Sequence, residues 1–181
     1  MMVKTIFAGF GGQGVLMMGF TLAHGAMSAG YHVTFLPAYG AEVRGGTANC
    51  TVVVSDEEIA SPIASKPDHL VVLNTPSLYT FQNRVAPGGF IFLNSSIISV
   101  EPSRHDVRLF KIPSSEMAEK LGNPRTANTV MMGAFLKKTG LVPPDIFLSS
   151  LAEVMGSKKK SIIEINRKAF SAGFHFFEES I

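Results

Sequence analysis

The chain has 181 residues, of which 46% are hydrophobic and 17% are charged, and its formal net charge at pH 7 is +2. This length and composition predict a single domain over residues 1–181 with a well-buried core. The small net charge argues against a nucleic-acid partner, and no run of about 20 apolar residues is present to span a membrane.

The beginning of the chain and its cysteine content indicate where the protein works. The N-terminal residues lead directly into a glycine-rich segment and lack the long apolar stretch and cleavage site of a signal peptide, so we expect a cytoplasmic protein. Cys50 is the only cysteine, so this chain alone cannot hold an iron–sulfur cluster or a structural zinc ion. Its place in an apolar strand pattern predicts a buried core residue.

Short apolar runs alternate with longer helical segments along the chain. A strand is predicted at residues 3–8, then a helix at 15–29 ended by Gly30, then a strand at 32–36 that Pro37 stops. Further strands are predicted at residues 49–54, 69–73, 90–93 and 107–112. Further helices are predicted at residues 77–83, 114–121 with Ser114 as N-cap, 125–138, 143–155 and 161–177. This alternation predicts a three-layer α/β fold: a Rossmann-like, mainly parallel sheet with helices on both faces.

Ligands and partners of a parallel sheet meet at the carboxyl ends of its strands. The segment 9–14, the loop 39–47, Asn74 and Asn94 each follow a predicted strand, so we expect them at one edge of the sheet. Asn74 and Asn94 would line a site there, or they would cap the turns that follow their strands.

The segment 9–14 matches the Gly-x-Gly-x-x-Gly fingerprint between a strand and a helix. Its glycines would allow a tight turn that brings backbone amides close to a phosphate group. These glycines are Gly9, Gly11, Gly12 and Gly14. Gln13 adds a side-chain amide that can donate and accept beside a ligand, or that can cap the helix.

A dinucleotide site also needs an acidic residue about 20 residues further on, where it binds the ribose hydroxyls. No acidic residue stands between Gly14 and Glu42, and no arginine takes that place for a phosphorylated cofactor. The segment is therefore a poor match to an NAD(P) or FAD site. Two interpretations stay open: a purely structural turn, or a loop that faces another phosphate-bearing cofactor or a partner subunit.

The loop after the second strand combines an aromatic ring, a carboxylate, a guanidinium group and two adjacent glycines. These residues are Tyr39, Glu42, Arg44, Gly45 and Gly46. An ion pair between Glu42 and Arg44 would close the loop internally. Alternatively, Arg44 binds a carboxylate or phosphate through its bidentate guanidinium, and the paired glycines let the backbone approach that ligand.

Elsewhere the chain offers no convincing catalytic acid, base or nucleophile. The histidines are scattered, and the paired serines lack the histidine and carboxylate partners of a hydrolase triad. Arg125 and Asn128 stand where a loop enters a predicted helix, which makes them candidates for an interface. The expected site residues are therefore for binding, not for catalysis.

The two loops together resemble the gamma subunit, or gamma domain, of 2-oxoacid:ferredoxin oxidoreductases. The similarity lies in Gly-Phe-Gly-Gly-Gln-Gly at residues 9–14, in Tyr-Gly-Ala-Glu-Val-Arg-Gly-Gly-Thr-Ala-Asn-Cys at residues 39–50, and in Asn-Thr-Val-Met-Met-Gly-Ala at residues 128–134. The first motif alone is moderately specific, whereas its pairing with the Glu-x-Arg-Gly-Gly loop at this spacing is strongly specific. The resemblance covers most of the chain.

This resemblance implies one subunit of an enzyme that oxidatively decarboxylates a 2-oxoacid to an acyl-coenzyme A and reduces ferredoxin. It implies alpha, beta and delta subunits as partners, which would bind the thiamine diphosphate, magnesium and iron–sulfur clusters. The chain lacks a Gly-Asp-Gly thiamine–magnesium motif, so none of these cofactors is expected on this chain alone. The resemblance implies that the chain helps to enclose the active site or binds coenzyme A, and that it is inactive alone. A short gamma chain with this loop slightly favours 2-oxoglutarate as the substrate.

Two other functions stay open. A stand-alone nucleotide-binding enzyme would bind nicotinamide as an isolated chain, and a non-catalytic scaffold subunit would keep full turnover after Arg44→Ala. The mean hydropathy of +0.24 is slightly high for a soluble monomer. It predicts apolar surface that partners cover, or that mediates self-association when the chain is isolated.

Overall fold

The computed structural model describes residues 1–40, 46–156 and 158–178. Within these residues, six strands form one sheet in the order β2-β3-β1-β4-β5-β6. The strands are β1 (Met2–Phe10), β2 (His32–Tyr39), β3 (Thr47–Ser55), β4 (His69–Val72), β5 (Phe90–Asn94) and β6 (Arg108–Ile112). The pairs β1–β4, β4–β5 and β5–β6 are parallel, whereas β3 is antiparallel to both β1 and β2. Because only β3 runs against the common direction, the prediction of a mainly parallel sheet is confirmed.

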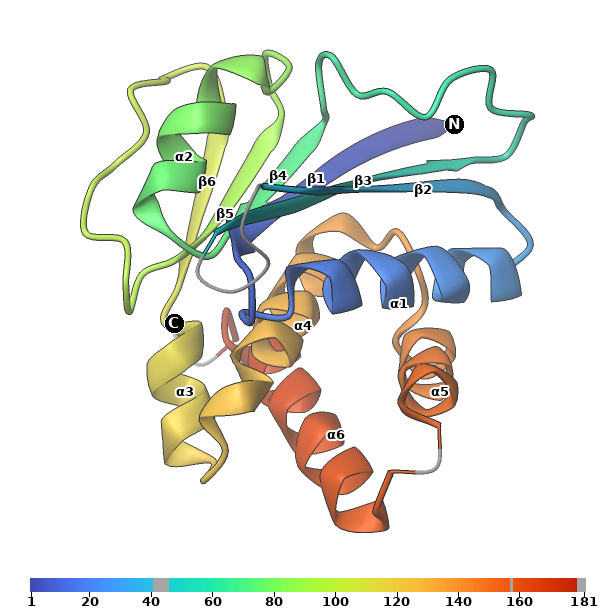
Figure 1. Ribbon diagram of the computed structural model, residues 1–181, viewed down its shortest axis with the longest axis vertical. Helices are drawn as coiled ribbons and strands as arrows, with labels where there is room; N and C mark the ends of the chain where they lie inside the picture. Colours follow the sequence, from blue (N-terminus) through green and yellow to red (C-terminus); the bar gives the residue numbers. More distant parts are fainter. Residues whose placement is uncertain (41–45, 157, 179–181) are drawn as a thin grey trace.

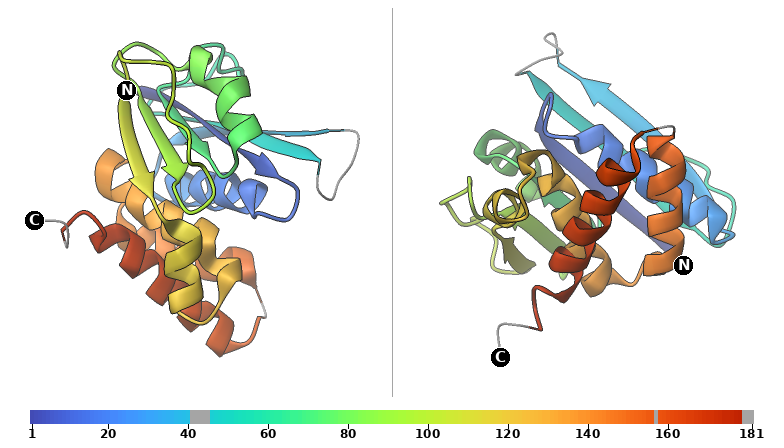
Figure 2. Two further views of the ribbon diagram at one scale, coloured as in Figure 1. Left: turned by 90° about the vertical axis from the view of Figure 1, so that its left-hand side faces the viewer. Right: turned by 90° about the horizontal axis from the view of Figure 1, so that it is seen from below.

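Helices cover both faces of this sheet, as predicted, but unequally. They are α1 (Val15–Ser28), α2 (Thr75–Phe81), α3 (Ser114–Lys120), α4 (Ala127–Thr139), α5 (Pro144–Met155) and α6 (Lys160–His175), with short 3-10 turns η1 (Gln82–Arg84) and η2 (Pro124–Thr126). Figures 1 and 2 show α2 on one face of the sheet, and α1 and α3 to α6 on the other. In the described residues, no helix combines the length and the apolar character needed to cross a membrane.

Successive strand residues point into two separate cores. Phe7 and Phe92 belong to the larger core, which lies under α1 and α3 to α6. Their neighbours Ile6 and Ile91 belong to the smaller core, which contains Leu78 of α2. Side chains of a strand alternate between the two faces, so a strand that is buried on both faces is apolar throughout.

Glycines set the closest contacts between the elements of the larger core. A Cβ atom at Gly19 of α1 would clash with the sulfur of Cys50 on β3. Cys50 is fully buried, which confirms the predicted core residue, and this burial raises the pKa of its thiol to about 12. Where α4 and α6 cross, a Cβ atom at Gly133 would clash with the carbonyl oxygen of Phe170.

Two local predictions are wrong. Strand β2 does not stop at Pro37 but continues to Tyr39. It is an edge strand, and an edge strand tolerates proline because the N–H groups on its open side need no partner. Ser114 is not the N-cap of its helix: Pro113 holds that position, Ser114 is the first helical residue, and its hydroxyl has no hydrogen-bond partner among the described residues.

We predict that Gly133→Ala lowers the free energy of unfolding by about 3 kcal/mol, because the new methyl group meets backbone atoms of α6 that cannot rotate away. The control is Gly25→Ala in α1, where a Cβ atom would lie 3.4 Å from Val142 in ordinary contact. That change should be neutral, or stabilising by up to about 1 kcal/mol. Urea denaturation of both variants measures this, and equal losses would contradict the close α4–α6 packing.

His69 makes the stability of the protein depend on pH. Burial lowers the pKa of His69 to about 4, although the carboxylate of Asp68 partly opposes this shift. Its ring lies 5.2 Å from that of Phe90 and 5.6 Å from that of Phe135, between ring centroids. In the unfolded chain histidine titrates near pH 6.5, so the unfolded state binds a proton first as the pH falls.

We therefore predict full stability above pH 6.5 and a progressive loss between pH 6.5 and pH 4. The contribution of His69 to this loss is about 2 kcal/mol at pH 5 relative to pH 8. His69→Gln should remove this part of the pH dependence. Urea denaturation of both proteins at pH 5 and pH 8 measures it, and parallel pH profiles would show that His69 protonates freely in the folded state.

Candidate functional site

The glycine segment forms the turn between the carboxyl end of β1 and the start of α1. Gly12 and Gly14 have φ angles of 99° and 77°, in the left-handed region that favours glycine. Gly14 is the N-cap of α1, and no side chain caps the helix there. A Cβ atom at Gly14 would clash with the side-chain amide of Asn128 on α4. These glycines therefore serve both the conformation of the turn and the close approach of α4.

Gln13 binds the turn to the neighbouring strand instead of capping the helix. Its Oε1 accepts a hydrogen bond from the N–H of Phe10 at 2.7 Å, and its Nε2 donates to the carbonyl oxygen of Leu73 at 3.1 Å. Asn74 also donates from Nδ2 to Oε1 of Gln13, at 3.4 Å. One side chain thus connects the ends of β1 and β4.

The two strand-end asparagines are buried and hold the turns that follow their strands. Asn74 caps α2, because its Oδ1 accepts a hydrogen bond from the N–H of Ser77 at 2.8 Å. Asn94 accepts from the N–H of Ser96 at 3.2 Å and donates from Nδ2 to the hydroxyl of Ser115 on α3 at 2.8 Å. Asn94 faces the cavity described below, whereas Asn74 is not among its lining residues.

The second loop meets the glycine turn at the same edge of the sheet. The N–H of Gly11 donates to the carbonyl oxygen of Gly46 at 2.9 Å. This meeting follows from the reversed direction of β3, which begins where β1 and β2 end. Tyr39, at the end of β2, is 61% exposed. The predicted contributions of Glu42, Arg44 and Gly45 lie outside the described residues.

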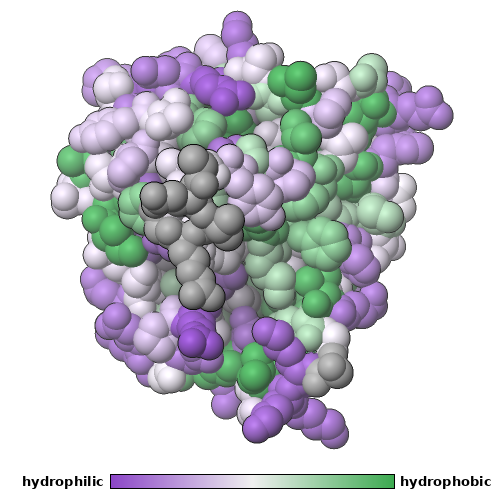
Figure 3. Space-filling view, in the orientation of Figure 1, coloured by the Kyte–Doolittle hydropathy of each residue, from purple (hydrophilic) through white to green (hydrophobic). Residues whose placement is uncertain are grey.

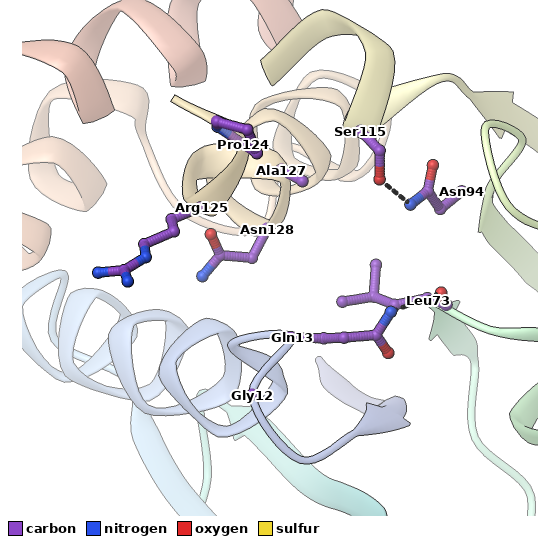
Figure 4. Close-up of a pocket in the computed structure, with 9 residues that line it drawn as sticks. All are labelled: Gly12, Gln13, Leu73, Asn94, Ser115, Pro124, Arg125, Ala127 and Asn128. Atoms are coloured by element: carbon purple, nitrogen blue, oxygen red, sulfur yellow. Dashed lines mark hydrogen bonds between the residues drawn. The ribbon is translucent and has the colours of Figure 1, made fainter. Parts of the chain in front are cut away.

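A cavity of about 250 Å³ opens at this edge, between the glycine turn and the helices that pack over it. Figure 4 shows how its walls come from distant parts of the chain. It is lined by Gly12 and Gln13 of the turn, Leu73 and Asn94 at two strand ends, Ser115 of α3, Pro124 and Arg125 of η2, and Ala127 and Asn128 of α4.

Arg125 is the one charged group among the described residues that line the cavity. No carboxylate of residues 1–40, 46–156 or 158–178 forms an ion pair with its guanidinium. The remaining polar groups of the wall are amides and a hydroxyl, which can donate or accept. A cation with neutral polar neighbours suits an anionic, oxygen-rich group such as a phosphate or carboxylate.

Three of the predicted site residues line the cavity: Gly12, Gln13 and Asn94. Of the other described ones, Gly11, Gly14, Gly46 and Asn74 bond or pack around the turn, whereas Gly9 lies in β1 and Tyr39 is exposed at the end of β2. Arg125 and Asn128, which the sequence placed only at an interface, belong to the wall. Leu73, Ser115, Pro124 and Ala127 were not predicted, because no local pattern shows that α3, η2 and the start of α4 fold over the ends of β4 and β5.

The sheet order weighs further against a dinucleotide site. In the Rossmann order the strand beside β1 is parallel to it, and its carboxyl end carries the acidic residue that binds the ribose. Here the neighbour of β1 on that side is the antiparallel β3. The amino end of β3 lies at the edge where β1 ends. Within the described residues, no carboxyl end of a strand therefore stands beside β1 at the place where a Rossmann sheet carries its ribose-binding acidic residue.

The family model described as pyruvate ferredoxin/flavodoxin oxidoreductase matches residues 4–176. Over 181 residues the chain is 45% identical to the ketoisovalerate oxidoreductase subunit VorA of Methanothermobacter thermautotrophicus. This match covers 99% of the present chain and 37% of VorA. The chain thus spans little more than a third of the length of that relative.

Two solved structures share the fold. The gamma subunit of a keto/oxoacid ferredoxin oxidoreductase from Geobacter sulfurreducens has a TM-score of 0.83 at 24% identity, and the match covers 98% of this chain and 99% of that one. The 2-oxoglutarate:ferredoxin oxidoreductase of Magnetococcus marinus, with 2-oxoglutarate, coenzyme A and succinyl-CoA bound, has a TM-score of 0.90 at 22% identity. That match covers 99% of this chain and 32% of the other.

We predict that Gln13→Met, which keeps the shape but removes the hydrogen bonds to Phe10, Leu73 and Asn74, lowers the free energy of unfolding by about 1–2 kcal/mol. The amide of Phe10 should then exchange with deuterium faster than in the wild type. Gln13→Glu is the control, since it keeps an acceptor for Phe10 but cannot donate to Leu73 when ionised. Unchanged exchange at Phe10 in Gln13→Met would mean that Gln13 does not hold the turn.

Proposed function

Because the chain belongs to the pyruvate ferredoxin/flavodoxin oxidoreductase family, we propose that it is the gamma-type part of a multisubunit 2-oxoacid:ferredoxin oxidoreductase. That enzyme oxidatively decarboxylates a 2-oxoacid to an acyl-coenzyme A and passes the electrons to ferredoxin. This chain works inside the complex, in the cytoplasm, and is inactive alone. Its partners are alpha, beta and delta subunits, which bind the thiamine diphosphate, the magnesium and the iron–sulfur clusters.

The cavity at the carboxyl edge of the sheet is the observation that carries this proposal. At about 250 Å³ it is smaller than the ~300–1,000 Å³ of pockets that enclose a whole drug-sized ligand. It therefore suits one part of a larger ligand, with a second polypeptide closing over the rest. A site completed by a partner fits a subunit better than it fits a free-standing enzyme.

Within the complex, we assign this cavity to the coenzyme A side of the active site. Arg125 would bind a phosphate of coenzyme A, because its guanidinium has no carboxylate partner among the described residues. The amides of Gln13, Asn94 and Asn128 would orient the ligand. The binding of coenzyme A by the Magnetococcus marinus enzyme, which contains this fold, supports the assignment.

The proposal is tested by tagging the chain in its native host and purifying it with its partners. The complex is assayed for viologen reduction with coenzyme A and each of 2-ketoisovalerate, 2-oxoglutarate and pyruvate. Co-purification of thiamine- and cluster-binding chains with this activity is the expected result. The preferred 2-oxoacid decides between 2-oxoglutarate, which the loop sequence favours, and the ketoisovalerate that the name of VorA indicates. A partnerless, inactive chain would refute the proposal.

We predict that Arg125→Gln in the complex raises the KM for coenzyme A by about 10- to 100-fold, because a charge-assisted hydrogen bond to phosphate is lost. The kcat at saturating coenzyme A should change little, and Arg125→Lys should restore part of the affinity. Arg167→Gln, which removes an exposed cation on α6, is the matched control. An unchanged KM in Arg125→Gln would place coenzyme A elsewhere.

Arg44 separates this function from a non-catalytic scaffold. If Arg44 binds an anionic ligand at the subunit junction, Arg44→Ala should lower kcat/KM at least about 10-fold while the complex still assembles. Size-exclusion chromatography checks the assembly, and steady-state viologen reduction measures the turnover. Full turnover in a fully assembled Arg44→Ala complex would favour the scaffold.

A further inference from the structure

The residues of α1 and of the edge strand β2 include no Asp, Glu, Lys or Arg. No Asp, Glu, Lys or Arg occurs between Lys4 and Glu42, although the whole chain has 30 such residues. On α1, Leu16, Phe20 and Met27 are four and seven residues apart, so they lie along one side of the helix. Phe20 is 47% exposed and Met27 is 63% exposed.

Strand β2 extends this surface beside the helix. The ring of Phe35 packs edge-on against that of Phe20, with 5.7 Å between the ring centroids. Tyr39, four residues further along the strand, points to the same side of the sheet and is 61% exposed. We call this surface the α1–β2 face; its residues are Leu16, Phe20, Met27, Phe35 and Tyr39. In Figure 3, hydrophobic surface gathers in the part of the molecule where Figure 1 places α1 and β2.

The composition of the α1–β2 face is that of a protein–protein interface. The centres of interfaces are depleted in charged residues and enriched in aromatic residues and methionine. A helix that faced only water along this side would carry charged residues there. We therefore expect a polypeptide to cover the α1–β2 face.

The lengths of the relatives indicate which polypeptide covers it. In VorA, the part that matches this chain is 37% of the protein, so most of VorA lies outside the match. In the Geobacter sulfurreducens gamma subunit the same fold makes up 99% of the chain. The domain thus occurs both alone and joined to a longer region, so a polypeptide outside the domain accompanies it in VorA and is the natural candidate to cover an apolar face of it.

We propose that the α1–β2 face binds the polypeptide region that corresponds to the part of VorA beyond the match. This inference rests on the proposed function, since it names the surface through which the chain joins its complex. The contact is made by side chains and not by adding a strand to the sheet. Pro37 lacks the N–H group that a further strand would need within the open edge of β2.

The test uses the full-length tagged chain in its native host, with two variants in the α1–β2 face. Both positions are exposed, so Phe20→Glu and Met27→Lys should retain the fold. Because the two variants introduce opposite charges, a loss of binding in both cannot result from the sign of the charge. Tyr79→Glu on α2 and Ile63→Lys are matched controls, since these side chains are 57% and 60% exposed outside the face. Circular dichroism and the Tm confirm that all four variants fold.

Mass spectrometry of the purified material then measures the companion chain, which is identified by its match to the rest of VorA. Wild type and both controls should retain it in equal amounts, whereas Phe20→Glu and Met27→Lys should lose it at least 10-fold. Full retention by both face variants would overturn the inference. If viologen reduction also persisted in them, the proposed function would stand and only the docking surface would be wrong.

Two further outcomes would each count against the inference. A homodimer that persists in the purified complex and is abolished by Phe20→Glu would show that a second copy of this chain covers the face. A wild-type chain that captures no companion and shows no viologen reduction would refute the proposed function together with the docking surface. Light scattering of the isolated chain and the activity assay distinguish these cases.

Discussion

The side-chain amide of Gln13 joins the carboxyl ends of β1 and β4, and the geometry of the site depends on it. Its oxygen holds the N–H of Phe10, and its nitrogen holds the carbonyl group of Leu73. The turn spans only residues 11–14, so α1 begins at Val15 directly after it, with Gly14 as its N-cap. Gly14 in turn lies against the side chain of Asn128 on α4, where a Cβ atom would clash with that side chain. The floor and one wall of the cavity follow from these contacts.

The reversed strand β3 supplies the second constraint. Because β3 runs antiparallel to β1 and β2, it begins at the edge where those strands end. The hydrogen bond between Gly11 and Gly46 therefore connects two motifs that are more than thirty residues apart in the sequence. In a Rossmann sheet a parallel strand would occupy this place, and its carboxyl end would serve a dinucleotide. Here the amino end of β3 lies at this edge instead, so the described residues do not reproduce that dinucleotide geometry.

Two features of the isolated chain, the cavity and the α1–β2 face, both favour a covering polypeptide. The cavity is too small to enclose a large ligand by itself, and the α1–β2 face leaves aromatic and methionine side chains in water. Under the proposed function, a covering polypeptide would account for both. The glycine turn lies between them, since it ends β1 and begins α1. We therefore expect that the cavity is closed and the face is covered in the same assembly.

The sequence by itself determined most elements, because apolar runs and the glycines and prolines between them act locally. It also determined that two loops with unusual composition would share one edge, since the carboxyl ends of strands in one direction must meet. Only the tertiary structure decided that Pro37 could stay within β2, because being an edge strand is a property of the sheet. Likewise, only the packing of α3 and η2 over β4 and β5 made Ser115 and Arg125 part of the cavity wall. Contacts between segments so distant in the chain depend on how whole layers pack, which no local pattern of residues records.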